Sequence, residues 1–182
     1  MTAMVTAEEL IQKLGLKPHR EGGWFAEVWR APERLAVNAL PPRYCGARSL
    51  STAIYYLITP ESFSRLHRLR SDELFHFYLG DPVEFLLLEP EGAGRIAQGT
   101  RQHGDGRTVI VGPDVMAGQV PQLVVRRGTW QGARLVAGGK FALLGTTMAP
   151  GFEYDDYEEA DAASLAKEYP ARAALIRALC PR

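Results

Sequence analysis

The sequence predicts a single all-β domain, because short β-forming runs follow one another and turn-forming residues separate them. The expected strands lie at 24–30, 51–58, 62–69, 73–79, 83–89, 94–98, 107–111, 121–126, 131–136 and 140–147. Many short strands at this spacing favour a sandwich or barrel over alternating strands and helices. No internal repeat or second domain is visible, so one domain is expected over residues 1–182, with a barrel core at about 22–154.

Helices are expected only at the two ends of the chain. At the N-terminal end, Thr6 can cap a helix that runs to Leu14, and Gly15 ends it. At the C-terminal end, residues 160–179 have a helical pattern. Pro170 interrupts that pattern and is expected in the first turn of a second helical piece, where proline is tolerated.

Charge balance and cysteine usage narrow the class of protein. Lys plus Arg and Asp plus Glu each number 21, and the absence of a basic surplus argues against a nucleic-acid partner. The zero net charge favours self-association. Cys45 and Cys180 lie far apart, which argues against a disulfide framework or a cysteine-built zinc site and favours a cytoplasmic location. No secretory leader or membrane-spanning apolar run is present, so no membrane is expected.

The segment from Ser64 to Gly80 holds the most informative residues. Two expected strands flank a polar turn, and a hairpin there would bring His67 close to Glu73. An imidazole beside a carboxylate can ligate a metal or transfer protons. An ionised Glu73 is also expected to raise the basicity of His67. The alternative is a surface ion pair, or a histidine satisfied within the core. His76 lies on the face of its strand opposite to Glu73, so it is a second-rank catalytic candidate.

This segment resembles the first motif of the cupin superfamily, a glycine followed by His-x-His, Glu and Gly at set intervals. His67, Glu73 and Gly80 match the first histidine, the glutamate and the last glycine. Leu69 stands in place of the second histidine, which is usually a metal ligand. In the second cupin motif, Gly128 is kept and Gln131 replaces the third histidine.

Further segments narrow the resemblance to the cupin-5 family, a branch of small cupins without an agreed substrate. They are residues 19–30, 52–57, 72–80, 128–131 and 149–154, and the match runs from about residue 10 to the terminal helix. Arg20 departs from the family pattern, which usually has proline there. The resemblance implies a double-stranded β-helix, or jelly-roll barrel, and usually a homodimer.

Other side chains are candidates for ligand binding. Glu27 and Arg30 lie on opposite parities of the first long strand, and Arg30 could hold an anion or pair with a surface carboxylate. Trp130 could line a pocket or fill the core. Gln131 follows it and could act with His67.

The sequence favours a cupin pocket that works without a metal or other cofactor. Epimerase-like chemistry on a sugar nucleotide is one interpretation, with His67 abstracting a proton next to a carbonyl. Binding of a small polar or anionic molecule without chemistry is the second. A metal enzyme that uses His67, Glu73 and Gln131 is the third, and the missing histidines weaken it.

Overall fold

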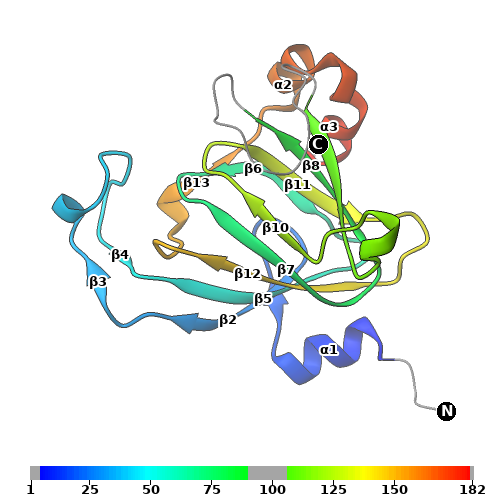
Figure 1. Ribbon diagram of the computed structural model, residues 1–182, viewed down its shortest axis with the longest axis horizontal. Coiled ribbons are helices and arrows are strands. Elements are labelled where there is room, and N and C mark those ends of the chain that lie inside the picture. Colours follow the sequence, from blue (N-terminus) through cyan, green and yellow to red (C-terminus); the bar gives the residue numbers. More distant parts are fainter. Residues whose placement is uncertain (1–4, 90–105, 181–182) are drawn as a thin grey trace.

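The computed structural model describes residues 5–89 and 106–180, and two β-sheets facing one another dominate it (Figure 1). Among the described residues, the larger sheet has six strands in the order β1 (Lys17–Pro18), β2 (Trp24–Arg30), β5 (Thr52–Ile58), β12 (Ala142–Met148), β7 (Glu73–Gly80) and β10 (Gln122–Val125). The smaller sheet has five in the order β13 (Tyr157–Glu159), β6 (Ser64–Leu69), β11 (Trp130–Leu135), β8 (Val83–Leu88) and β9 (Arg107–Val111). β3 (Arg34–Leu35) and β4 (Arg48–Ser49) form a separate short ribbon. The predicted all-β jelly roll is therefore confirmed, while the strand expected at 94–98 lies outside the described residues.

The core lies between the two sheets because alternate residues of each strand point inward. On β8, Phe85 and Leu87 join the central apolar cluster, and Phe85 meets Phe75 of β7 across the interior with ring centroids 4.7 Å apart. The intervening residues of β8, Leu86 and Leu88, point to the other face of their sheet and pack under the C-terminal helices. A strand buried on both faces explains the continuous apolar run at this point of the sequence.

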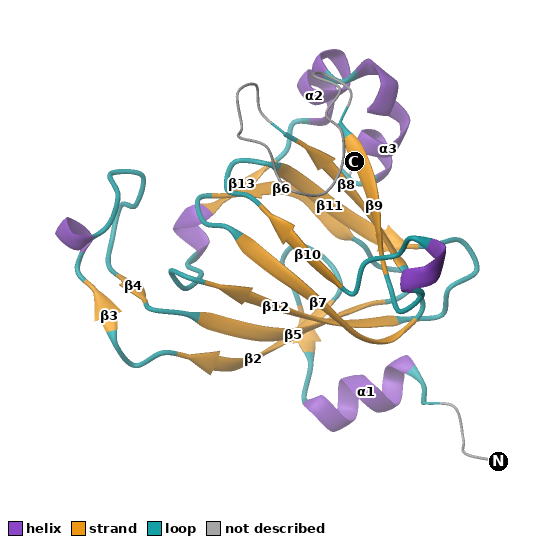
Figure 2. Ribbon diagram, viewed as in Figure 1, coloured by secondary structure: helices purple, strands orange, loops and turns teal. Residues whose placement is uncertain are grey.

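Helices cover the outer faces of both sheets (Figure 2). α2 (Ala162–Glu168), η4 (Pro170–Arg172) and α3 (Ala173–Ala178) pack on the smaller sheet, and α1 (Ala7–Leu14) packs on the larger one. Short 3-10 turns are η1 (Val37–Ala39), η2 (Val115–Ala117) and η3 (Tyr154–Asp156). Thr6 caps α1 and Gly15 ends it in the left-handed region, as predicted. No helix of the described chain is long and apolar enough to span a membrane.

The predicted hairpin at Arg70–Asp72 is wrong. β6 pairs with β11 and β13, whereas β7 pairs with β12 and β10, so the turn carries the chain from one sheet to the other. The sequence pattern of strand, turn and strand is the same for a hairpin and for a turn that connects two sheets. Which of the two forms depends on the distant strands with which each strand pairs. His67 and Glu73 consequently approach each other across the barrel interior rather than within one sheet.

Candidate functional site

His67 lies on the inner face of β6 and is 1% exposed. Its Nδ1 is 2.6 Å from the carbonyl oxygen of Arg65, and because a carbonyl only accepts, Nδ1 carries the ring proton. In the neutral ring, Nε2 is then a bare proton acceptor. Tyr157 of β13 stacks on the ring, with centroids 5.2 Å apart. The imidazole is thus held in one orientation, with Nε2 turned toward other polar side chains.

Gln131 joins the two sheets at this point. It lies opposite His67 in the pairing of β11 with β6 and is 2% exposed. Its amide nitrogen donates to Glu73 Oε2 at 2.8 Å and lies 3.4 Å from His67 Nε2. Its amide oxygen is buried and has no hydrogen-bond partner among the described residues. A buried acceptor without a partner is costly, so it marks a position where a bound molecule could donate.

Glu21 reaches the same place from the loop before β2 and is 8% exposed. Its Oε2 lies 3.5 Å from His67 Nε2 and 3.7 Å from His19 Nδ1. We refer to His19, Glu21, His67, Glu73 and Gln131 as the interior cluster. Glu21 was not among the site residues predicted from the sequence.

The loop that carries Glu21 is firmly held. The Glu21 carbonyl accepts from the Arg65 amide at 2.8 Å, and the Gly22 carbonyl accepts from the Tyr56 hydroxyl at 2.8 Å. Gly22 has φ 97°, and a Cβ there would overlap the Phe63 carbonyl oxygen. Only glycine fits such a position. The Gly22-Gly23 pair, visible in the sequence, was the available signal of a tight positive-φ turn directly after Glu21.

Burial controls the electrostatics of the cluster. It raises the pKa of Glu21 to about 8, and burial followed by the charge of Glu21 raises the pKa of Glu73 to about 7. Burial, followed by the charge of His67, lowers the pKa of His19 to about 4. Burial also lowers the pKa of His67, outweighing the opposite effect of Glu73. The expected effect of Glu73 on the basicity of His67 is therefore present, but desolvation dominates and makes the net pKa shift downward.

Near neutral pH the cluster consequently combines neutral imidazoles with a Glu21 carboxyl that keeps its proton and a Glu73 carboxyl that is partly ionised. Among the described residues, no arginine or lysine lies within ion-pair distance of Glu21 or Glu73. Proton acceptors and proton donors are thus placed side by side among buried side chains, an arrangement suited to proton transfer.

Comparison with known proteins identifies the family. The Cupin_5 family model, described as Cupin superfamily (DUF985), matches residues 8–160. The chain belongs to the Cupin_5 family. A hypothetical protein from Leishmania major is 33% identical to this cupin, with a TM-score of 0.82 over 98% of this chain and all of that one (100%).

Two further relatives agree with this assignment. Protein SO0799 from Shewanella oneidensis, whose crystal structure is known, is 29% identical, with a TM-score of 0.79 over 98% of this chain and 99% of that one. The uncharacterized protein YML079W of Saccharomyces cerevisiae (strain ATCC 204508 / S288c) is 28% identical over 159 residues, 82% of this cupin and 73% of the yeast protein. These names state no activity, so the chemistry must be inferred from the site itself.

The donor set does not fit a bound metal. Metal-binding cupins are expected to present three histidines and a glutamate, whereas this cupin has Leu69 and Gln131 at two of the histidine positions. Gln131 turns its amide nitrogen, which is not a metal ligand, toward His67 and Glu73. In residues 5–89 and 106–180, no group of three or more His, Cys, Asp or Glu side chains is placed to hold a metal ion. The alternative of a metal enzyme using His67, Glu73 and Gln131 is therefore not supported.

His76 is not part of the interior cluster. It points to the face of β7 opposite to Glu73 and Phe75, as the strand parity predicts. Its Nε2 lies 3.2 Å from Thr147 Oγ1, and its Nδ1 lies 3.1 Å from the Gln122 amide nitrogen. The structure thus separates this second-rank catalytic candidate from His67.

Glu27 and Arg30 pair with each other instead of facing the cluster. The pairing of β2 with β5 shifts between Glu27 and Trp29, and this bulge brings Glu27 and Arg30 to one face. The prediction of opposite parities is wrong for this reason. Arg30 donates to Glu27 at 2.8 and 3.0 Å and to Glu153 at 3.1 Å. The guanidinium is therefore engaged by carboxylates of its own chain.

Trp130 also lies away from the interior cluster. It neighbours Gln131 on β11 and so points to the other face of the sheet, where it packs against the apolar cluster under the C-terminal helices. The guanidinium carbon of Arg68 lies 4.5 Å from the centroid of its ring. Filling of this outer core, the alternative considered for Trp130, is what the structure shows.

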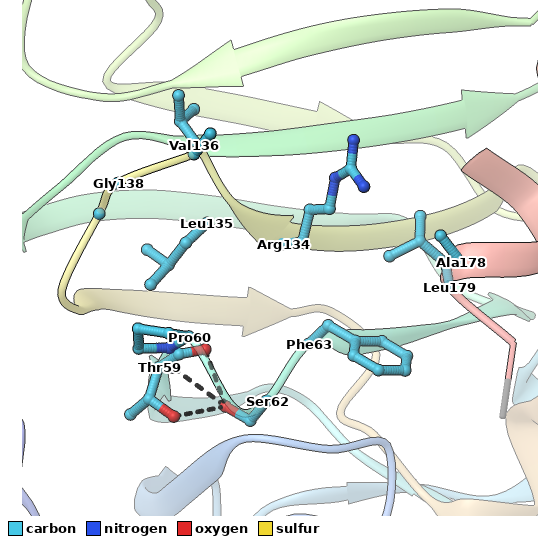
Figure 3. A pocket seen from close by; sticks show the side chains of 12 residues that line it. Thr59, Pro60, Ser62, Phe63, Arg134, Leu135, Val136, Gly138, Ala178 and Leu179 are labelled. Atoms are coloured by element: carbon cyan, nitrogen blue, oxygen red, sulfur yellow. Dashed lines mark hydrogen bonds between the residues drawn. The ribbon is translucent and has the colours of Figure 1, made fainter. Parts of the chain in front are cut away.

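A cavity of about 250 Å³ opens elsewhere on the molecule (Figure 3). Residues of the β5–β6 loop, of the turn at 134–139 and of the end of α3 line it. Arg134, the charged residue among them, pairs with Glu84 at 2.9 Å. No residue of the interior cluster lines this cavity, so it is a separate feature.

Proposed function

We propose that this cupin binds a small polar molecule at its interior cluster and moves a proton on it, as isomerases and epimerases do, using side chains alone. The observation that carries the proposal is the unprotonated Nε2 of His67, which lies 3.5 Å from Glu21 Oε2 and 3.4 Å from the Gln131 amide nitrogen that also donates to Glu73. A general base must be unprotonated at the working pH and oriented toward the proton it takes.

His67 meets both requirements. The lowered pKa keeps the ring neutral, and the Arg65 carbonyl fixes the tautomer that leaves Nε2 without a proton. When Nε2 takes a proton, Glu73 can stabilise the imidazolium, because an opposite charge nearby favours the charged form. Gln131 connects the two side chains across the barrel. Glu73 and Gln131 therefore serve as the supporting partners of the base.

A polyhydroxylated anion such as a sugar nucleotide suits this site. The unpaired oxygen of Gln131 can accept a hydrogen bond from a substrate hydroxyl. Arg20 is exposed, and its guanidinium carbon lies 5.9 Å from the centroid of the Tyr157 ring that covers His67. An arginine at this position can contact a phosphate or carboxylate.

The expected homodimer stays a prediction, which light scattering at micromolar protein tests.

The competing function is binding without chemistry, and the unpaired Gln131 oxygen suits it equally well. In that case His67 and Glu73 would only orient hydroxyl groups of the ligand. Turnover of a bound compound distinguishes the two functions, because a pure binder returns its ligand unchanged.

The test is a thermal-shift screen with sugar nucleotides and small hydroxycarbonyl compounds. A ligand at one hundred times its Kd stabilises the folded state by about 2.7 kcal/mol, which corresponds to roughly 5–10 °C for a chain of this size. His67→Asn keeps an amide near the Arg65 carbonyl and removes Nε2, and His76→Asn is the matched control. We expect the shift in the wild type and the control and its loss in His67→Asn. An equal shift in His67→Asn would place the ligand elsewhere.

A further inference from the structure

Glu21 enters the interior cluster from a loop rather than from a barrel strand. The loop is fixed by the Arg65 and Tyr56 hydrogen bonds and by the glycine conformation at position 22, so the carboxyl has a set position. Burial of a carboxyl without an arginine or lysine partner opposes folding. A rigid loop that nevertheless holds such a group against an imidazole indicates a role in chemistry rather than in packing.

We propose, resting on the proposed function, that Glu21 is the acid partner of His67 and that the pair isomerises an α-hydroxycarbonyl compound, moving protons on one face of the substrate. The substrate class follows from what the two side chains do. His67 takes a proton from a carbon atom, and Glu21 gives a proton to a carbonyl oxygen beside that carbon. The hydroxyl next to the carbonyl can donate a hydrogen bond to the unpaired amide oxygen of Gln131.

The separation of the two side chains favours transfer on one face. Reacting atoms approach to about 3–3.5 Å, so two groups that act on opposite faces of one carbon stand roughly 6–7 Å apart. Glu21 Oε2 and His67 Nε2 are only 3.5 Å apart. A substrate cannot lie between them and must meet both from the same side. This geometry suits proton transfer between adjacent atoms of the substrate. It does not suit inversion of a carbon centre by Glu21 and His67.

Glu21 is a better acid than Glu73 on the basis of its contacts. The Glu73 carboxyl accepts from the Gln131 amide at 2.8 Å and also interacts with Thr146. The Glu21 carboxyl faces the two imidazoles, and its pKa is the more raised, to about 8, because burial outweighs the opposite effect of the Arg20 charge. Near neutral pH it therefore keeps a proton that it can give.

The reaction balances without an added reagent. His67 Nε2 takes the proton from the carbon beside the carbonyl, and the electrons of that C–H bond form a C=C bond. The carbonyl oxygen takes the Glu21 proton, which gives an enediol. The adjacent hydroxyl then returns its proton to the Glu21 carboxylate and becomes the new carbonyl, while the original carbonyl carbon takes the proton from Nε2. The carbonyl has moved by one carbon, and both side chains are restored.

The experiment follows carbon-bound hydrogen in heavy water by NMR. The probes are D-glyceraldehyde, dihydroxyacetone and their phosphate esters, and the proteins are the wild type, Glu21→Gln, His67→Asn and Glu33→Gln. Glu33 is exposed and serves as the matched control. We expect isomerisation with deuterium uptake in the wild type and the control. A missing acid or base should lower the rate by about 10²–10⁴-fold in the two cluster variants.

The possible outcomes separate the two proposals. Loss of activity in His67→Asn but not in Glu21→Gln would overturn the role of Glu21 and leave the base in place. Inversion at carbon with no movement of the carbonyl would overturn transfer on one face. Absence of exchange with every probe would overturn the isomerase proposal and the substrate class together. The wild-type pH profile adds an independent reading, because the rate should fall above about pH 8 as Glu21 loses its proton.

Discussion

The buried carboxyls predict that this cupin loses stability as the pH rises above about 6.5. The pKa of Glu21 rises from 4.5 to about 8 on folding, and that of Glu73 rises to about 7. Between the unfolded and folded pKa values only the folded chain holds these protons. The stabilisation is therefore complete below about 4.5 and is lost as the pH climbs through the folded values.

The histidines change stability with pH in the opposite direction, and they do so below about pH 6.5. His19, with its pKa lowered from 6.5 to about 4, and His67, lowered by burial, are neutral in the fold. The stability that these neutral histidines contribute is present above their unfolded pKa of 6.5 and is lost as the pH falls below it. Above about pH 6.5 the carboxyls dominate the change within the interior cluster.

The expected magnitude follows from about 1.4 kcal/mol per pH unit for each group. From pH 6.5 to 8, Glu21 accounts for about 2 kcal/mol and Glu73 for less than about 1 kcal/mol. The sum lowers Tm by roughly 5–10 °C for a chain of this size. Glu21→Gln removes the larger part, so its unfolding free energy should fall by less than about 1 kcal/mol over the same range.

The assay is urea unfolding at constant ionic strength between about pH 6.5 and 8.5, where a well-defined slope with pH is expected. Glu33→Gln, an exposed change of the same chemistry, should follow the wild type. A wild-type stability that stays constant over this range would refute the reasoning. So would an equal fall in Glu21→Gln, because the protons would then be held elsewhere.

Four substitutions test the framework of the fold by the same urea assay. Gly22→Ala should destabilise by more than about 3 kcal/mol because its Cβ would overlap backbone, whereas Gly128→Ala, also at positive φ but with nothing within 4 Å, should lose only about 1 kcal/mol. Asp156→Ala leaves the buried Arg48 without its bidentate partner at 2.7 and 2.9 Å, for which a loss of about 3–5 kcal/mol is expected. Thr6→Ala removes the cap of α1 and should lose about 1 kcal/mol. Equal losses at the two glycines, or unchanged stability in the other two variants, would contradict these assignments.

Local signals predicted most elements of the fold correctly. The turn residues and alternating strands located β5 (Thr52–Ile58) to β12 (Ala142–Met148) within a few residues where the chain is described, and the cap at Thr6 located α1. These features depend on neighbours in sequence. The hairpin at Arg70–Asp72 was wrong because pairing with distant strands decides which sheet each strand joins.

The site was predicted in part. His67, Glu73 and Gln131 were found because the cupin-like motif spacing corresponds to inward positions of β6, β7 and β11, and the structure brings them together. Glu21 was missed because its burial comes from a loop that a distant strand holds in place. The opposite parities expected for Glu27 and Arg30 were wrong because a bulge, which strand parity does not reveal, brings both to one face. Pairing of Arg30 with a carboxylate, one of its two alternatives, is what the structure shows.

The protonation state of the His67 ring tests the central claim most directly. Nitrogen-15 NMR of the histidine rings, assigned with His67→Asn, reports whether each ring nitrogen carries a proton. At pH 7 we predict a neutral His67 with its proton on Nδ1 and a bare Nε2, because burial disfavours the charged ring and the Arg65 carbonyl selects the tautomer. A charged ring, or a neutral ring with its proton on Nε2, would contradict the assignment of His67 as the proton acceptor.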